Sequence, residues 1–225
     1  MQIPPRTFTI VLCLLGALLA SSAQAQIQPR IRPLPSNEWS PKVEKMLGGT
    51  RNRVAELEGH APIKDKTAEP KTLNILRTLA HHPDLMGPFL GFASALAQEG
   101  ALTRRDSEIL ALRASWNCQS EFEWGHHVEY GQTAGLTMAE IARIPLGPNA
   151  PGWTQEDRML LEAADQLHAG QQISDALWSR LSVRFTEKQL VEIPFVVGQY
   201  TMLSMFANAA RVELEAGYDG LPQLK

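Results

Sequence analysis

The most constraining feature of this sequence is a set of threonines that each stand three residues before a carboxylate or amide side chain. The pairs are Thr103 with Asp106, Thr137 with Glu140, Thr154 with Asp157, and Thr186 with Gln189. In such a pair the threonine hydroxyl accepts a hydrogen bond from the third amide of a helix, and the later side chain reaches back to the threonine amide. The pattern therefore predicts four helix N-termini between residues 103 and 187.

Alternating β-branched residues, which are typical of strands, are nearly absent. The best strand candidate is LVEIPFVVG, residues 190–198, and Pro194 counts against it. Residues 71–83 and 84–100 have apolar positions spaced by three and four, which favours two helices, the second capped by Asp84 and ending at Gly100. We therefore predict an all-α fold, a single helical-bundle domain with roughly seven to nine helices.

The N-terminal residues have the pattern of an export signal. One cation, Arg6, precedes the apolar run IVLCLLGALLA, and Ala23 and Ala25 then form an A-x-A cleavage pattern. The run is too short to span a bilayer, so no membrane anchor is expected. We predict a signal peptide over 1–25 with cleavage after Ala25, a periplasmic or secreted product, an extended proline-punctuated arm over 26–40, and the helical domain over 41–225.

Cysteine usage and charge exclude several classes of protein. Removing residues 1–25 would remove Cys13 and leave a 200-residue chain with a single thiol, Cys118, which cannot form an internal disulfide. The formal net charge is −3, and the lysines and arginines are dispersed along the chain. Neither nucleic acid nor a membrane surface is an expected partner.

The stretch NCQSEFEWGHHVEYG, residues 117–131, concentrates the ionisable side chains. If residues 119–134 form one helix, Ser120, Glu123 and His127 share a face within an arc of about 60°, while Cys118 points about 160° away from Ser120. The preceding helix carries Glu108 beside an apolar stripe. A carboxylate beside such a stripe lies either on the solvated side of the helix, which is the favoured interpretation because Glu is rarely buried unpaired, or inside a pocket, where it could meet Glu123 and His127.

These residues resemble the carboxymuconolactone decarboxylase and alkylhydroperoxidase D-like family. Peroxidases of the family carry a Glu, eleven residues, and then C-x-x-C-x-x-x-H; here Glu108, Ser120, Glu123 and His127 stand at the four positions with the same spacing. The resemblance extends loosely over residues 70–215 and also implies a homo-oligomer, often a trimer or hexamer. It departs from the peroxidases at both cysteine positions, and disulfide exchange needs two sulfurs. Cys118 lies on another face, so a thiol peroxidase is not expected.

The remaining chemistry is acid–base catalysis. A histidine paired with one carboxylate, beside a second carboxylate whose pKa is raised by burial, suits proton transfer to or from carbon or oxygen. We predict an exported, cofactor-free enzyme of the decarboxylase or isomerase type that acts on a small organic acid or lactone. The predicted catalytic residues are Glu108, Glu123 and His127, and the predicted substrate-binding residues are Arg113, as the cation for a substrate carboxylate, together with Ser120 and Trp124.

Two alternatives use the same residues. Glu123 and His127 have the i, i+4 spacing of two metal ligands on one helix face, and Glu108 could supply a third, which would make a metal-dependent enzyme. The other alternative is a non-catalytic oligomer that binds a small molecule. For Cys118, the favoured interpretation is a small buried apolar residue.

Overall fold

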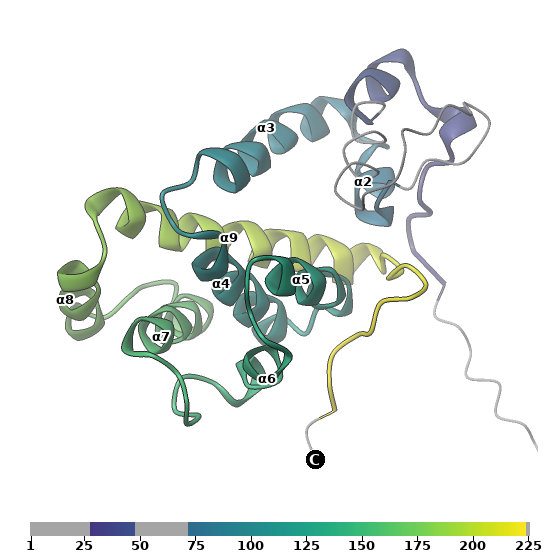
Figure 1. Cartoon of the computed structure of the whole chain (residues 1–225). Coiled ribbons are helices and arrows are strands. Elements are labelled where there is room, and N and C mark those ends of the chain that lie inside the picture. The colour runs from purple at the N-terminus through teal and green to yellow at the C-terminus, as the bar shows by residue number, and fades with distance from the viewer. Residues whose placement is uncertain (1–27, 48–71, 224–225) are drawn as a thin grey trace, which may run out of the picture.

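The computed structural model describes residues 28–47 and 72–223, and within these ranges it contains helices and no strand. The predicted all-α fold is therefore confirmed. Residues 41–47 are helical. The remaining elements are η1 Ser36–Glu38, α2 Asn74–Leu79, α3 Pro83–Glu99, α4 Arg104–Asn117, α5 Glu121–Thr133, α6 Met138–Ile141, η2 Ile144–Leu146, α7 Gln155–Gly170, α8 Asp175–Arg184 and α9 Glu187–Ala210 (Figure 1). The predicted signal peptide and its cleavage point lie outside the described residues.

The threonine pairs define helix starts as predicted. Thr137, Thr154 and Thr186 form reciprocal capping boxes at the starts of α6, α7 and α9. Thr103 caps α4 by accepting a hydrogen bond from the Asp106 amide. At α3 the expected cap was wrong: the helix begins one residue before Asp84, and the ring nitrogen Nδ1 of His82 accepts the Leu85 amide at 3.3 Å.

The strand candidate over 190–198 is also helical. It lies inside the 24-residue helix α9, and Pro194 falls within that helix. The capping box at Thr186 starts the helix eight residues before the proline, and burial of Ile193, Val196 and Val197 stabilises the segment. Tertiary packing therefore outweighs the local cost of the proline.

Helix α4 lies at the centre of the bundle and packs against α5, α7 and α9 (Figure 1). Its residues 107–115 are all buried. The main core joins Ile109, Leu110 and Leu112 of α4 to Leu160 of α7 and Ile193 of α9. Because α4 is enclosed on every side, polar side chains within it must find partners inside the protein.

Two smaller apolar clusters hold the outer elements. Val43, Leu47, Ala80 and Met86 pack together beneath the N-terminal helices. A third cluster joins Ile75, Phe122 and Ala207. The chain before α2 is tied to the domain by backbone hydrogen bonds from Arg30 to Ala210 at 2.8 Å and from Leu34 to Arg77 at 3.0 Å.

Helix α9 is long and apolar enough to cross a membrane, the one such helix among the described residues. Its mean hydropathy is 1.3 over the most apolar 18 residues, and 44% of that window is buried in this chain. One face of α9 packs on α4, α5 and α7. The opposite side carries exposed apolar residues, among them Val191, Phe195 and Met205.

Candidate active site

Glu108, Glu123 and His127 converge inside the protein as the sequence predicts. Oε2 of Glu108 lies 2.6 Å from Nδ1 of His127, and Oε2 of Glu123 lies 3.6 Å from Nε2 of the same ring. The exposed fractions are 0% for Glu108, 4% for Glu123 and 5% for His127. One imidazole is therefore flanked by a carboxylate at each nitrogen in an environment almost free of bulk water.

The local sequence of each helix explains this convergence. Ser120 is the N-cap of α5, and its hydroxyl accepts the Glu123 amide at 3.4 Å, which fixes the start of that helix. Glu123 and His127 then stand one turn apart on one face. Glu108 lies one turn after the start of α4 and faces α5, because α4 and α5 pack side by side.

The electrostatics of the cluster favour a proton on the ring and a proton on Glu123. Burial opposes the charge on His127, but the neighbouring Glu108 carboxylate, which accepts the Nδ1 hydrogen bond, raises the pKa of His127 above its usual value. Burial raises the pKa of Glu123, while the nearby histidines act in the opposite direction. Glu123 and His127 both have raised pKa values, and the Glu123 carboxylate lies beside Nε2 of His127.

Arg104 is a member of this cluster that the sequence interpretation missed. Its Nη2 atom donates to Oε1 of Glu108 at 2.5 Å, and its side chain is 48% exposed. Glu108 therefore binds His127 with one oxygen and a half-exposed guanidinium with the other. The i, i+4 spacing from Arg104 to Glu108 is the signal that was available in the sequence.

Two tyrosines cover the histidine. The Tyr200 ring from α9 lies edge-on to His127 with ring centroids 4.4 Å apart, and the Tyr130 ring is edge-on at 5.3 Å. Tyr130 is 37% exposed. Tyr130 and Arg104 are thus partly exposed neighbours of the buried cluster.

The three residues predicted to bind substrate have other roles in the structure. Arg113 was predicted to bind a substrate carboxylate, but its guanidinium already binds both carboxylate oxygens of Asp165, at 2.6 and 2.9 Å. It also donates to the carbonyls of Ile144 and Pro145, at 2.8 and 3.2 Å. These contacts use its donors to fasten the η2 segment and α7 to α4. Its position in the sequence, five residues after Glu108, indicates a different face of the helix.

Ser120 and Trp124 are also explained without a substrate. Ser120 is fully buried, and its hydroxyl caps α5. Trp124 is 3% exposed, belongs to the main core and lies edge-on to Trp116 with ring centroids 6.0 Å apart. Both residues build the helix that carries His127, and their contact with substrate stays a prediction.

His126 points away from His127, as the helical wheel indicates. Its Nε2 atom is 2.6 Å from Oε2 of Glu215, and its ring contacts Phe122 and Tyr218. The other oxygen of Glu215 accepts the Asn74 amide at 2.6 Å. Burial opposes the charge of Glu215, but these hydrogen bonds hold its pKa below the usual value. This pair fastens the C-terminal segment to α5 and α2.

Cys118 is separate from the Glu108–His127 cluster. It follows α4 as the C-cap residue, is partly buried, and its sulfur lies 3.8 Å from Nδ1 of His168. Burial raises the pKa of the thiol. A raised pKa lowers the fraction of nucleophilic thiolate, which agrees with the sequence interpretation of Cys118 as a packing residue.

Among the described residues, no group of three or more histidine, cysteine, aspartate or glutamate side chains is arranged to hold a metal ion. At His127 the Nδ1 atom is already bonded to Glu108. Its Nε2 atom faces Oε2 of Glu123 at 3.6 Å, which is longer than a hydrogen bond.

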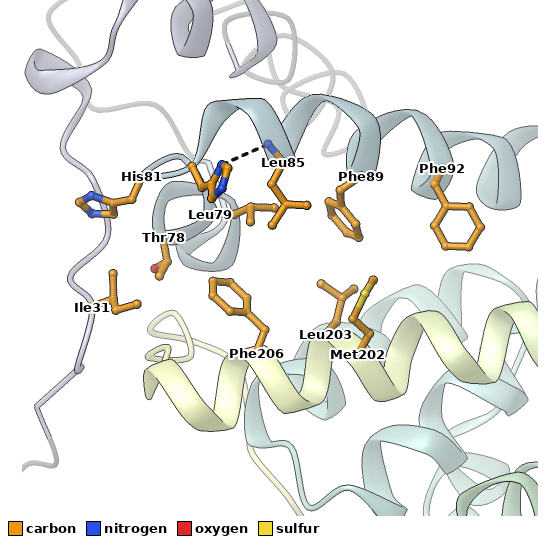
Figure 2. Close-up of a pocket in the computed structure, with 11 residues that line it drawn as sticks. Ile31, Thr78, Leu79, His81, Leu85, Phe89, Phe92, Met202, Leu203 and Phe206 are labelled. Carbon is orange, nitrogen blue, oxygen red and sulfur yellow. Dashed lines mark hydrogen bonds between the residues drawn. The ribbon is translucent and has the colours of Figure 1, made fainter. Parts of the chain in front are cut away.

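A cavity of about 470 Å³ lies elsewhere, between α2 and α3 on one side and α9 on the other (Figure 2). Figure 2 shows Met202, Leu203 and Phe206 of α9 facing Leu85 and Phe89 of α3 across this space. Its lining is almost wholly apolar and includes none of Glu108, Glu123 and His127. The apolar cavity and the acid–base cluster are therefore distinct features.

Solved structures share this fold. A peroxidase-related protein with an alkylhydroperoxidase AhpD core from Ralstonia eutropha is 17% identical, with a TM-score of 0.66 over 83% of this chain and 93% of that one. A protein of unknown function from Agrobacterium tumefaciens is 19% identical, with a TM-score of 0.58 over 61% and 95% of the two chains. The debrominase Bmp8, solved with 2,3,4-tribromopyrrole, is 12% identical, with a TM-score of 0.62 over 84% and 94%. The fold is that of the AhpD-like helical proteins.

A comparison of the sequence with protein families agrees with the likeness in fold. The model of the carboxymuconolactone decarboxylase family matches residues 83–166, which run from the start of α3 into α7 and include Glu108, Glu123 and His127. This match and the shared fold support the predicted resemblance to the carboxymuconolactone decarboxylase and alkylhydroperoxidase D-like family. Comparison with curated proteins gives no match.

Proposed function

We propose that this protein is an exported enzyme that uses Glu108, His127 and Glu123 for cofactor-free proton transfer on a small organic acid or lactone. The observation that supports it best is the 2.6 Å contact between Oε2 of Glu108 and Nδ1 of His127, both buried, with Glu123 beside the opposite ring nitrogen. A buried relay of this kind sets the tautomer of the histidine and brings its pKa toward neutral working conditions.

In the proposed reaction, Glu108 accepts a hydrogen bond from the Nδ1–H group of His127. This bond orients the ring so that Nε2 faces the proton that is transferred. Glu123, whose pKa is raised, supplies or stores a proton 3.6 Å from Nε2. In a decarboxylation, the electron pair of the broken carbon–carbon bond remains on the substrate carbon, and this acid protonates that carbon as carbon dioxide leaves. In an isomerisation, the same pair removes a proton from one carbon and returns it to another.

Arg104 takes the role that the sequence assigned to Arg113. It is the half-exposed cation in contact with Glu108, whereas the donors of Arg113 are used by Asp165 and two carbonyls. A carboxylate of the substrate would pair with the Arg104 guanidinium, which would leave Glu108 as the partner of His127 alone. Tyr130 would form part of the entrance, since it is partly exposed and contacts the ring of His127.

The test is turnover of a panel of lactones and unsaturated acids, followed by carbon dioxide release and by proton exchange with solvent. Glu108→Gln and His127→Asn should each lower kcat by at least about 100-fold, the usual contribution of a positioned acid or base. Glu129→Gln is the matched control, because Glu129 lies on the exposed side of the same helix α5. Full activity in both folded variants would remove this proposal.

A further inference from the structure

An apolar cavity of about 470 Å³ separates α3 from α9 (Figure 2). It is formed by α2, α3 and α9, whereas the bond between Glu108 and His127 joins α4 to α5. Protein interiors are packed as densely as organic crystals, and they contain few voids larger than a water molecule. Water that is held inside a protein needs polar partners, few of which this lining offers. A cavity of this kind is suited to an apolar ligand.

Contacts at both ends hold the two walls of the cavity in place. At one end, the Phe92 ring of α3 lies against the Phe195 ring of α9, with ring centroids 6.1 Å apart. At the other end the N-terminal segment runs past α9, where the Arg30 amide donates to the Ala210 carbonyl at 2.8 Å. Ile31, the next residue, lines the cavity at the end opposite to Phe92 (Figure 2). Because both ends are fastened, the space between the walls is maintained by the fold itself.

The cavity is elongated along α3. Leu85, Phe89 and Phe92 line it from this helix, and seven residues of α-helix rise by about 10 Å. From α9, Met202 and Phe206 line the opposite wall. The volume lies in the lower half of the range for small-molecule sites, which is about 300 to 1,000 Å³. A narrow apolar slot of this length matches one extended alkyl chain better than a flat ring system or a lipid with two chains.

The cavity is open to solvent. Two of its lining residues, Leu85 and Met202, are 54% and 43% exposed. Figure 2 shows them on opposite walls, Leu85 on α3 and Met202 on α9. Methionine has a flexible side chain that adapts to neighbours of different shape. A small molecule can therefore enter between these walls without the unfolding of either helix.

Two histidines supply the polar atoms at the Ile31 end of the cavity. Nε2 of His81 lies 3.0 Å from the Arg32 carbonyl oxygen, so this nitrogen carries the hydrogen and donates. Nδ1 of His82 accepts the Leu85 amide at 3.3 Å, so in the neutral ring the hydrogen is on Nε2. Among the described residues, this Nε2–H group of His82 has no acceptor. It is an available donor beside an apolar slot.

The charged side chains next to these histidines are already paired. Arg32 binds Glu38 at 2.7 Å, and Lys42 binds Asp84. The N–H group of His82 is thus a free donor next to side chains whose charges are matched. A carboxylate is an acceptor, and its charge makes such a hydrogen bond stronger than one between neutral groups. The donor therefore favours a ligand whose polar end is a carboxylate.

We propose that this cavity binds a single-chain carboxylic acid of medium length. The alkyl chain lies between α3 and α9 with its methyl end toward Phe92, and the carboxylate accepts a hydrogen bond from Nε2 of His82. Because His82 is exposed, the charged end of the ligand stays in contact with water while its carbon chain is buried. The site is separate from the acid–base cluster, so this inference is independent of the function proposed above.

The test is isothermal titration calorimetry of the protein with hexanoate, octanoate and decanoate, each below its micelle concentration. Decanoate should bind at one site per chain. Each methylene removed should raise the Kd about fourfold, because burial of one methylene contributes about 0.8 kcal/mol. Decanol has the same chain and no charge, and its Kd should be about tenfold higher than that of decanoate, because a hydrogen bond to a charged acceptor is stronger.

Substitutions locate the chain and the carboxylate. Met202→Trp adds volume to the α9 wall and should raise the Kd of decanoate at least about tenfold, because the side chain competes with the ligand for space. Met205→Trp is the matched control: it makes the same change on the same helix, at a position that is 60% exposed and outside the lining, and it should leave the Kd unchanged. His82→Asn keeps a good helix N-cap and removes the ring N–H, so the preference for decanoate over decanol should be lost.

Circular dichroism would verify that all variants keep their helices. Absence of decanoate binding, a Kd that is constant along the chain-length series, or equal effects of the two tryptophan variants would overturn the inference. A preference for decanoate that survives in His82→Asn would overturn the place given to the carboxylate. Binding to phosphatidylcholine vesicles without binding of decanoate would overturn the proposal in favour of a lipid surface.

Discussion

Glu108 and His127 are nineteen residues apart in the sequence and share a hydrogen bond of 2.6 Å inside the helical bundle. The bond joins α4 to α5 at a point where both side chains are almost completely buried. Breaking such a pair on one side leaves the other group without its partner in a medium that solvates it poorly. The first prediction concerns this bond.

Glu108→Gln should lower the pKa of His127, because the charge and the hydrogen bond of the Glu108 carboxylate are what raise it. The free energy of unfolding should fall by about 2 to 3 kcal/mol, and the protein should remain folded. Nuclear magnetic resonance titration of the imidazole would measure the first effect and urea unfolding the second. An unchanged pKa of His127 would show that the Glu108 carboxylate does not form a hydrogen bond with the imidazole ring in solution.

The second prediction concerns the pH dependence of stability. Folding raises the pKa values of both Glu123 and His127, so the native state binds more protons than the unfolded state. Their contribution is complete below the unfolded pKa values, 4.5 for Glu123 and 6.5 for His127, and is lost as pH rises through the folded values. Because the two groups interact, the steps belong to the pair.

The wild type should therefore lose stability relative to the Glu123→Gln and His127→Asn variants as pH increases from about 5 to 9. Urea unfolding at several pH values, with each variant as the reference, isolates this contribution from other titrating groups. A difference that stays constant or grows with pH would contradict the assignment.

The third prediction distinguishes Arg113, which has a structural role, from Arg104, which is proposed to bind the substrate. Arg113→Ala should reduce the free energy of unfolding by about 3 kcal/mol, because it removes the cation that pairs with Asp165, leaves Asp165 with Asn117 as its donor, and leaves the Ile144 and Pro145 carbonyls without this donor. Arg104→Gln should cost at most about 1 kcal/mol, because its side chain is half exposed.

Enzyme kinetics, once a substrate is known, should show the larger effect in the Arg104 variant and the smaller effect in the Arg113 variant. Arg104→Gln should raise KM for an acidic substrate, while Arg113→Ala should leave the KM of the folded fraction unchanged. An Arg113→Ala protein of wild-type stability with a raised KM would return Arg113 to the substrate site.

The fourth prediction tests the caps. Thr137→Ala removes the hydroxyl half of the capping box at α6, where Oγ1 of Thr137 accepts the Glu140 amide at 3.2 Å and donates to Oε2 of Glu140 at 2.7 Å, and it keeps the bond from the backbone amide of residue 137 to Oε2. The expected loss is about 1 kcal/mol. Ser120→Ala should cost a similar amount at α5, with no change in KM, since its hydroxyl is buried at the helix start. A large KM effect in the Ser120 variant would place this residue against the substrate.

The fifth prediction concerns the thiol. Cys118 should react with iodoacetamide more slowly than a free thiol at neutral pH, and its rate should rise at higher pH than usual, because burial raises its pKa. Cys118→Ser should leave enzymatic turnover unchanged. Rapid alkylation near neutral pH would show an activated thiolate.

The sequence predicts those parts of this fold that depend on local signals. The threonine pairs mark four helix starts, and the one-turn spacing of Glu123 and His127 places them on one face. The approach of Glu108 was an expectation that rested on family spacing, and its contact with His127 depends on how α4 and α5 pack.

The remaining features depend on contacts distant in the sequence. Arg113 was predicted to be the cation for a substrate carboxylate, and its partner Asp165, 52 residues away, could not be predicted from the local sequence. The 190–198 segment has strand-like composition, and its helical state results from the cap at Thr186 and from burial against the core. His82 replaces Asp84 as a cap through a ring nitrogen, an acceptor that sequence rules for caps do not include.

The Glu215 carboxylate, which joins His126 to the Asn74 amide, also constrains the order in which the protein can form during synthesis. Glu215 follows Asn74 by 141 residues and His126 by 89, so the helix that carries His127 is synthesised long before the side chain that anchors it. A variant truncated before residue 215 would keep Glu108, Glu123 and His127 and would lose the clasp on α5.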